Sequence, residues 1–346
     1  MDILRLGSLE ISPFLPPLVI AEIGINHGGS LDVAKKMVDA AHHAGCQCIK
    51  HQTHIIDDEM SPAAKNVIPG NANISIYDIM ESCALSEDDE YALKQYVESK
   101  GMLFLSTPFS RAAANRLQKF AVAAFKIGSG ECNNYPLLKH IAAFGKPVIL
   151  STGMNDIDSI RKATAIFHRH GIPFALLHTT NLYPTPPRLV RLGAMRELMS
   201  AFEGTPIGLS DHTLNNNACI AAVALGACIV ERHFTDDKNR SGPDIACSMD
   251  GWELAQLIAA VTEVHAMRGG HKEADVEEKV TMDFAFATVV AILDIKRGEK
   301  LAKDNIWVKR PGTGQIPAEH YESLLGKTAV RDIAAGSHLN YSEISP

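Results

Sequence analysis

The chain has 346 residues, of which 46% are hydrophobic and 21% are charged, as in ordinary globular proteins. Its net charge of −7, with no basic run, argues against a nucleic-acid partner. The longest apolar stretch, residues 218–230, is too short to cross a membrane, and the first residues lack the features of a signal peptide. We therefore expect a cytoplasmic protein with no membrane partner, whose seven cysteines are reduced core residues.

Eight short apolar runs recur along the first 235 positions, and each ends in polar residues. They begin at Leu18, Cys48, Leu103, Ala124, Pro147, Phe174, Ile207 and Cys228. Continuous aliphatic and β-branched runs separated by helical segments are typical of repeated βα units with a buried parallel sheet. Eight such units predict the α/β class and a TIM (β/α)8 barrel, whose active site lies at the C-terminal strand ends.

Helix signals and one long insertion lie between these runs. Ser30 precedes a predicted helix that ends at Gly45, and Ser86 precedes another that ends at Gly101. Residues 55–82 form the longest insertion between a predicted strand and its helix. A long loop on the active face of a barrel is usually a substrate-binding element, and we expect that role here.

The C-terminal part of the chain contains an internal repeat. Residues 294–306 (DIKRGEKLAKDNI) and 332–344 (DIAAGSHLNYSEI) share the pattern D-I-x-x-G-x-x-L-x(4)-I. Together with short β-like stretches, the two copies predict a small, mostly β module with pseudo-symmetry. The expected organisation is a barrel over residues 1–270, a linker over 271–283 and a second domain over 284–346.

Two histidines end consecutive predicted strands. His212 and His233 are 21 residues apart (233 minus 212), which is one βα repeat. Neighbouring strand ends lie about 5 Å apart, so two inward imidazoles could share one metal ion. Without a thiolate nearby, a six-coordinate ion such as Mn²⁺ suits the pair better than structural zinc. The alternative is that each histidine only hydrogen-bonds to the backbone.

Two lysines lie within predicted strands, where an inward ammonium is costly unless an anion pairs with it. These are Lys50 and Lys126; alternatively, each could extend its ammonium to the rim. Short polar side chains end the same strands, and each could instead be a helix cap: Ser106, Thr107, Ser129, Ser151, Thr152, Asn181 and Ser210. Together they predict a pocket for a small polyanion. Glu22 and Glu131 add a candidate proton-transfer group and a hydrogen-bond acceptor.

A resemblance extends from about Leu18 to the end of the chain. It is carried, in order, by AEIGINHGGS, KHQTH, STPFS, KIGSGE, STGMN, NLYPTP, GLSDHT, ERHFT, GPD, KRPGTG and LLGK. These strings resemble the N-acetylneuraminate (sialic acid) synthases, the phosphoenolpyruvate-condensing transferases. The resemblance implies a TIM barrel followed by an antifreeze-like (SAF, β-clip) domain. It also implies a domain-swapped homodimer in which each SAF domain covers the partner's active site.

The resemblance further implies a reaction and its residues. Phosphoenolpyruvate, N-acetylmannosamine and water give N-acetylneuraminate and phosphate, through C–O bond cleavage and a tetrahedral intermediate. The implied cofactor is Mn²⁺ or another divalent cation such as Mg²⁺ or Co²⁺. The implied site residues are catalytic Glu22, His212 and His233, of which both histidines bind the metal; Lys50, Thr107, Lys126, Ser129, Asn181 and Ser210 for phosphoenolpyruvate; and Gln52, Asn71, Tyr77, Glu131, Tyr183, Asp244 and Arg310 for the sugar.

Other functions remain open at this stage. Sister enzymes that make legionaminic or pseudaminic acid use diacetamido-deoxy sugars, although the loop over residues 55–82 looks most like the N-acetylmannosamine type. A metal-dependent aldolase or isomerase would use the histidines but release no phosphate. A carbohydrate-binding or ice-binding protein would not need polar clusters at eight strand ends. The family implies a product destined for a capsule or a surface glycan.

Overall fold

The computed structural model describes residues 3–70 and 72–345 of the chain. The chain divides into two compact units, residues 1–269 and 270–346. Each unit has its own hydrophobic core. No helix among the described residues is long and apolar enough to span a membrane.

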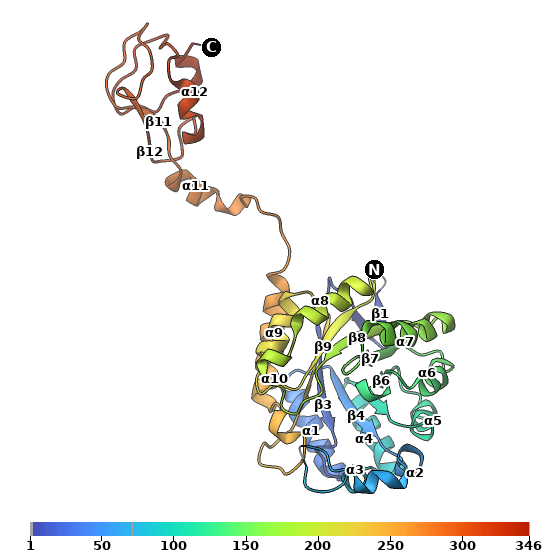
Figure 1. Cartoon of the computed structure of the whole chain (residues 1–346). Helices are drawn as coiled ribbons and strands as arrows, with labels where there is room; N and C mark the ends of the chain where they lie inside the picture. The colour runs from blue at the N-terminus through green and yellow to red at the C-terminus, as the bar shows by residue number, and fades with distance from the viewer. Residues whose placement is uncertain (1–2, 71, 346) are drawn as a thin grey trace. The chain divides into compact units, whose positions relative to one another are not determined.

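The first unit is a ring of eight parallel strands surrounded by helices (Figure 1). The strands follow the order β5-β4-β3-β10-β9-β8-β7-β6, and β5 and β6 lie side by side. Their bounds are β3 Leu18–Gly24, β4 Cys48–Thr53, β5 Leu103–Pro108, β6 Phe125–Ile127, β7 Val148–Ser151, β8 Phe174–Thr179, β9 Ile207–Asp211 and β10 Ile229–His233. All eight predicted runs are therefore barrel strands, and the predicted TIM barrel is confirmed.

The surrounding helices begin where the sequence places capping residues. The Ser30 hydroxyl accepts the backbone N–H of Val33, and the Ser86 hydroxyl accepts that of Asp89. The outer helices are α1 Leu31–His43, α4 Glu87–Ser99, α5 Arg111–Lys119, α6 Tyr135–Ala142, α7 Ile157–His170, α8 Leu192–Ala201, α9 Asn217–Ala224 and α10 Gly251–Ala266. Their apolar faces pack onto the outward side chains of the strands.

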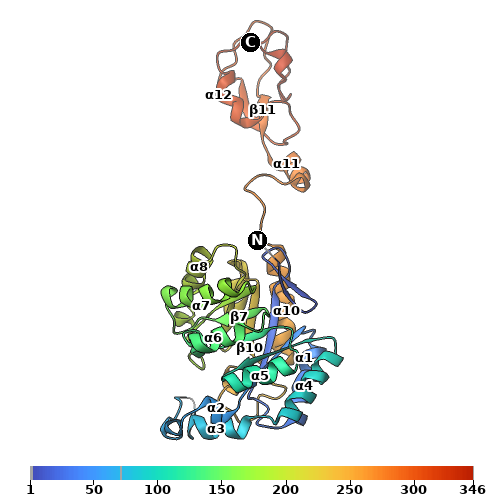
Figure 2. The same ribbon diagram turned by 90° about the vertical axis from the view of Figure 1, so that its right-hand side faces the viewer.

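The long insertion after β4 carries two further helices. α2 spans Ile56–Glu59, α3 spans Ile76–Cys83, and a 3-10 turn over Pro62–Asn66 lies between them. Both helices lie at the end of the barrel opposite strand β1 (Leu4–Leu6) (Figures 1 and 2). The insertion therefore borders the C-terminal ends of the strands, where the site was expected.

A two-stranded hairpin closes the other end of the barrel. β1 (Leu4–Leu6) pairs antiparallel with β2 (Leu9–Ile11), and Gly7 in the turn has φ +60. The hairpin buries Leu4, Leu6 and Ile11 against the lower, aliphatic layer inside the barrel. The sequence analysis did not predict this hairpin. The hairpin therefore covers the end of the barrel opposite the polar strand ends with aliphatic side chains.

Strand alternation decides which side chains face the barrel interior. Along β10, Ile229 belongs to the lower interior layer, while Val230 packs in the outer core beneath the helices. The next inward positions are Glu231 and His233. Arg232 faces outward, fully buried, with its Nε 3.3 Å from Asp211 Oδ2. The interior therefore changes from aliphatic at the bottom to charged at the mouth.

The second unit contains the predicted repeat in a reciprocal arrangement. Ile295 and Ile333 occupy equivalent repeat positions and exchange backbone hydrogen bonds of 2.9 and 2.8 Å. The Asp332 carboxylate accepts the N–H of Arg297, and the Asp294 carboxylate accepts that of Ala335, both at 2.8 Å. Each copy thus caps the loop of the other, which explains why the same residues recur.

Short strands and turns make up the rest of the second unit. β11 (Thr288–Ala291) pairs antiparallel with β12 (Ile306–Lys309), and α12 spans Tyr321–Leu324. Part of the segment expected as a linker, 271–283, is helical: it holds a 3-10 turn over Val276–Glu278 and most of α11 (Lys279–Ala285). The strongly polar run before this turn gave no apolar period from which a helix could be predicted.

Candidate active site

Four buried charged side chains form the centre of the barrel mouth. Lys50 Nζ lies 2.5 Å from Glu22 Oε2 and 2.9 Å from Glu231 Oε1. Lys126 Nζ lies 3.5 Å from the same Glu231 oxygen. The hydroxyl of Ser210 also donates to this oxygen, at 2.9 Å. Three neighbouring inward positions on β3, β4 and β10 and a fourth on β6 therefore share one network.

Burial and charge shift the pKa values in this network. Burial by itself raises the pKa of Glu231, but the opposing pull of Lys126 and Lys50 is larger in sum and lowers it to about 2. Burial lowers the pKa of Lys50 to about 8, and it lowers the pKa of Lys126 as well. At neutral pH the Glu231 carboxylate is therefore ionised and the Lys50 ammonium is protonated.

Glu231 is the residue that the sequence analysis missed. The lysines do not extend to solvent, because Lys50 is 6% and Lys126 is 1% exposed. Their buried charges instead meet carboxylates of the protein itself. A signal was present: Glu231 precedes His233 by two residues in a strand, and alternation places both on the same face.

The two histidines lie together at the rim. Their ring centroids are 5.4 Å apart, and the Tyr183 ring lies 4.1 Å from that of His212. His212 Nδ1 donates to the Thr180 carbonyl at 2.8 Å, which leaves Nε2 as the unprotonated nitrogen. His212 therefore does bond to the backbone, and this bond also fixes the tautomer that a metal ligand needs.

The two histidines suit a divalent cation because of their protonation states and their available ring nitrogens. Burial lowers the pKa of His212 to about 4 and that of His233 well below its usual range, so both rings are neutral. In the described part of the chain, buried His233 Nδ1 has no hydrogen-bond partner, and Asp244 Oδ2 lies 3.8 Å away. Among the same residues no group of three or more His, Cys, Asp or Glu could hold a metal. An ion at this pair would therefore complete its shell with water and substrate oxygens.

A second cluster of polar groups surrounds Lys126. The ammonium donates to Ser151 Oγ at 2.7 Å, and the Gly153 N–H donates to Ser129 Oγ at 3.0 Å. A Cβ at Gly153 would lie 1.9 Å from Asn181 Oδ1 and 2.9 Å from Ser129 Oγ, so only glycine leaves room for this cluster. Buried Thr107 Oγ1 is without a hydrogen-bond partner within the described residues. Hydroxyl, amide and ammonium donors of this kind suit phosphate and carboxylate oxygens.

A cavity of about 270 Å³ lies beside the histidines. Three expected sugar-binding residues line it: Gln52, Tyr183 and Asp244. Burial raises the pKa of Asp244 to about 6. The long insertion supplies one wall, and the remaining lining residues are Ile25, Pro69, Ile76, Ile79, Met80, Phe109, His233 and Pro243.

The other expected sugar-binding residues do not line this cavity. Glu131 follows β6, and its carboxylate accepts from Asn134 at 2.5 Å. Tyr77 lies on α3, with Lys65 Nζ 4.4 Å from its ring centre. Arg310 follows β12 in the second unit and is exposed. Asn71 lies outside the described residues.

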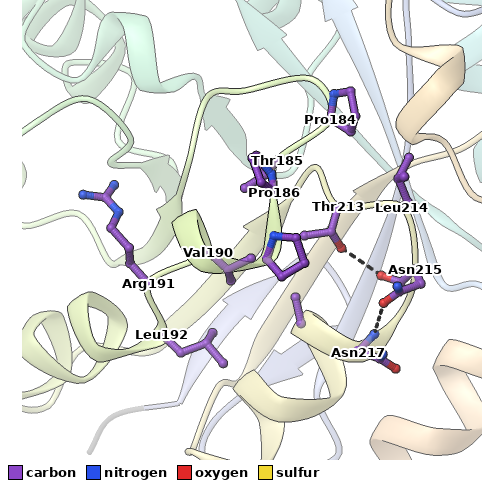
Figure 3. Close-up of a pocket in the computed structure, with 12 residues that line it drawn as sticks. Pro184, Thr185, Pro186, Val190, Arg191, Leu192, Thr213, Leu214, Asn215 and Asn217 are labelled. Atoms are coloured by element: carbon purple, nitrogen blue, oxygen red, sulfur yellow. Dashed lines mark hydrogen bonds between the residues drawn. The ribbon is translucent and has the colours of Figure 1, made fainter.

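A larger cavity, about 600 Å³, lies elsewhere on the barrel (Figure 3). Its walls are the segment from Pro184 to Leu192 and the residues around the start of α9. Arg191 is the one titratable side chain among its described lining residues, and prolines and aliphatic groups make up much of the rest. The cavity lacks the paired acid, base or ligand groups that catalysis needs, so size does not identify the site here.

Buried histidines should also make the protein sensitive to acid. Burial, assisted by His51, lowers the pKa of His27 to about 3. Because this value is below 6.5, the unfolded chain takes up the proton first as the pH falls. We expect stability from His27 to be lost between about pH 6.5 and 3, by about 1.4 kcal/mol per pH unit. Urea denaturation at pH 7, 6 and 5 should show a shallower slope for His27→Asn, whereas parallel slopes would contradict the assignment.

The fold and the site define an enzyme of the TIM-barrel class with a polar, charged mouth. Comparison with family models identifies the NeuB family over residues 37–273 and a SAF domain over 286–345. The chain belongs to the NeuB family, whose members are transferase-type synthases. The resemblance and the second domain predicted from the sequence are thus confirmed.

Three relatives give the range of similarity. The chain is 38% identical to N,N'-diacetyllegionaminic acid synthase of Campylobacter jejuni, over 91% of this chain and 96% of the relative. It is 32% identical to human N-acetylneuraminate-9-phosphate synthase, over 90% and 88%. A crystal structure of N-acetylneuraminic acid synthetase from Leptospira borgpetersenii, in complex with citrate, matches with TM-score 0.74 at 31% identity, over 81% and 95%.

Proposed function

We propose that this chain condenses phosphoenolpyruvate with the open-chain form of an N-acetylated amino sugar and water, giving a nine-carbon sugar acid and phosphate. The observation that carries the proposal is the buried mouth of the barrel, where Lys50 and Lys126 lie beside a cluster of short donors. Phosphoenolpyruvate has a carboxylate and a phosphate at a fixed separation. Two lysines with hydroxyl and amide donors suit that pair of anions.

The charge balance supports a cation in the same pocket. Lys50 and Lys126 contribute two positive charges, and Glu22 and Glu231 contribute two negative ones, so the buried network is neutral. A polyanion entering a neutral low-dielectric site needs a further positive charge. We propose that His212 and His233 hold it as Mn²⁺, Mg²⁺ or Co²⁺. When bound there, such an ion would polarise the aldehyde oxygen as a Lewis acid.

The chain's own residues have separate roles in the proposed reaction. Lys50, Lys126, Thr107, Ser129, Asn181 and Ser210 bind phosphoenolpyruvate. Carbon 3 of the enol attacks the aldehyde carbon, and water then adds to carbon 2. Glu22 accepts a proton of that water and returns it to the alkoxide formed from the aldehyde. The tetrahedral intermediate then loses phosphate by C–O cleavage, and its hydroxyl proton leaves with the phosphate. A buried carboxylate with one oxygen 2.5 Å from the Lys50 ammonium suits this base.

The acceptor sugar has two candidates. N-acetylmannosamine is the acceptor that the sequence favours. The apolar wall formed by Ile25, Ile76, Ile79 and Met80 favours the second candidate, a diacetamido-deoxy hexose. Such a sugar replaces hydroxyl groups by methyl and acetamido groups, which pack well on aliphatic side chains. The legionaminic acid synthase among the relatives also supports it.

One assay tests the function and separates the acceptors. The protein is mixed with Mn²⁺ and phosphoenolpyruvate, and inorganic phosphate is measured with each sugar and with none. We expect sugar-dependent phosphate release, with kcat/KM higher for one acceptor. An aldolase or isomerase would release no phosphate, and that result would overturn the proposal.

We further propose that the protein is a cytoplasmic homodimer. In this dimer Arg310 of each subunit would contact the sugar bound at the partner's site. Arg310 is exposed on the second unit. An exposed arginine that serves a site on another subunit can be tested by complementation. Mixed dimers of Arg310→Ala and His212→Ala chains should regain activity, because one site keeps both residues. Verified mixed dimers with no regained activity would count against the shared site.

A further inference from the structure

A chain of hydrogen bonds connects the barrel mouth to the inserted loop. Gln52 Nε2 donates to Glu22 Oε1 at 2.9 Å. Gln52 Oε1 lies 3.1 Å from His54 Nε2, and His54 Nδ1 lies 2.8 Å from Glu59 Oε2. The chain of contacts therefore runs from Glu59 on α2, through His54 and Gln52, to the candidate base Glu22.

The proton positions in this chain follow from its acceptors. An ionised Glu59 carboxylate can only accept hydrogen bonds, so with Glu59 ionised the His54 Nδ1 donates to it. Gln52 has its NH₂ group directed to Glu22, so its carbonyl oxygen faces His54 and must also accept. Both ring nitrogens of His54 then donate. In this arrangement of hydrogen bonds the ring would hold two protons and a positive charge.

The surroundings of His54 accommodate that charge. The ring is 4% exposed and stacks on Phe109, with centroids 4.7 Å apart and planes at 8°. Glu59 supplies the counter-charge, with a side chain 9% exposed. The nearby His27 is neutral, because burial and its histidine neighbours lower its pKa to about 3. His27 therefore adds no positive charge beside His54.

The opposite orientation of the Gln52 amide needs a different distribution of protons. If the amide turned over, its oxygen would face Glu22 and its nitrogen would face His54. Glu22 would then have to be protonated, and His54 would have to lose one proton. The two arrangements hold the same number of protons. The orientation of one amide thus decides whether the proton lies on His54 or on Glu22.

We propose that His54 is a positioning residue for Glu22. As an imidazolium paired with Glu59, it fixes the Gln52 amide with its nitrogen towards Glu22, and so keeps Glu22 ionised and able to accept a proton. The role in catalysis rests on the proposed function, whereas the protonation of His54 does not. Gln52 also lines the cavity beside the histidines, so its fixed amide presents one defined face to the sugar.

The protonation of His54 can be measured directly on the resting protein. ¹⁵N-histidine NMR of the full chain distinguishes doubly protonated rings from either neutral tautomer, and the signal lost in His54→Phe assigns the residue. We expect both His54 nitrogens to be protonated at pH 7, and one proton to be lost in Glu59→Gln. A neutral His54 in the unmodified chain would overturn the proposal, whatever the enzyme's activity.

Kinetics then test the positioning role. His54→Phe keeps an aromatic ring against Phe109 but removes both donors. We expect kcat/KM for the sugar to fall about tenfold or more, which corresponds to the loss of one hydrogen bond of about 1.4 kcal/mol. The KM for phosphoenolpyruvate should change less than twofold. His54→Gln keeps one amide donor and should recover part of the loss.

The matched control is His178→Phe. This histidine is also buried, but its Nε2 bonds to the Val190 carbonyl away from Gln52. His178→Phe should lower Tm about as much as His54→Phe does, and its KM for the sugar should be unchanged. If His54→Phe instead raised the KM of both substrates equally with a fall in Tm, the role would be structural and the proposal wrong. Absence of phosphate release in the unmodified protein, with a doubly protonated His54, would refute only the proposed function.

Discussion

Replacement of His233 by alanine is expected to reduce kcat by about 10³-fold or more. The reason is that the two imidazoles are the neutral ligands proposed for the divalent cation, and Lewis-acid stabilisation of a developing alkoxide supplies several kcal/mol. The fold should persist, because His233 Nδ1 makes no hydrogen bond within the described residues. Phosphate release with saturating Mn²⁺ measures the first effect, and thermal unfolding measures the second.

The control for this variant is His178→Ala, a buried histidine bonded to backbone outside the site. It should lower Tm while phosphate release continues. Calorimetric titration with Mn²⁺ should show binding to the unmodified chain and none to His233→Ala. A near-normal rate of His233→Ala in the presence of a chelator would refute the metal site.

Removal of the Glu231 charge is expected to have the largest effect on stability. Glu231→Gln leaves Lys50 and Lys126 close together in a buried site with one negative partner, Glu22. Breaking a buried ion pair typically costs 3–5 kcal/mol, so we expect the free energy of unfolding to fall by about 3 kcal/mol. Urea denaturation at pH 6.5 measures this loss.

The loss should be smaller at pH 9. Glu231 raises the pKa of Lys50, which burial holds at about 8. Without Glu231 the buried lysine loses its proton more easily. The free-energy cost of this deprotonation falls as the pH approaches 10.5, the ordinary pKa of a lysine. Phosphoenolpyruvate should also protect Glu231→Gln against unfolding more than it protects the unmodified chain, because it supplies the missing anion. A loss below about 1 kcal/mol at pH 6.5 would contradict the network.

The matched control for Glu231→Gln is Glu343→Gln. Glu343 pairs with Arg331, whose side chain is 59% exposed, in the second unit. Because the Arg331 end of this pair is in solvent, we expect the pair to contribute at most about 1 kcal/mol. A comparable loss in both variants would show that removal of any glutamate, and not the buried network, lowers stability.

The barrel could be predicted because its strands carry two signals at once. Each run is continuously apolar, as a strand buried on both faces must be, and each ends in polar residues at the mouth. The hairpin over residues 4–11 could not be predicted. Its strands have three residues each, and packing against the aliphatic layer inside the barrel stabilises them.

The site was predictable in its residue types but not in its pairings. Alternation places Lys50, Glu231 and His233 inside the barrel, yet only the structure shows that the lysines meet protein carboxylates before any ligand. The sequence also gave no sign that His54 contacts Gln52, because residues two apart in a strand normally share a face without a defined bond. Side-chain direction beyond the strand end decided that contact.

An isotope measurement shows which bond of phosphoenolpyruvate breaks in the proposed reaction. Phosphoenolpyruvate is labelled with ¹⁸O at the oxygen that bridges carbon and phosphorus, and the products formed with the accepted sugar are analysed by mass spectrometry. We expect the label in inorganic phosphate, because water attacks carbon 2 and the C–O bond breaks. Recovery of the label in the sugar acid would contradict it.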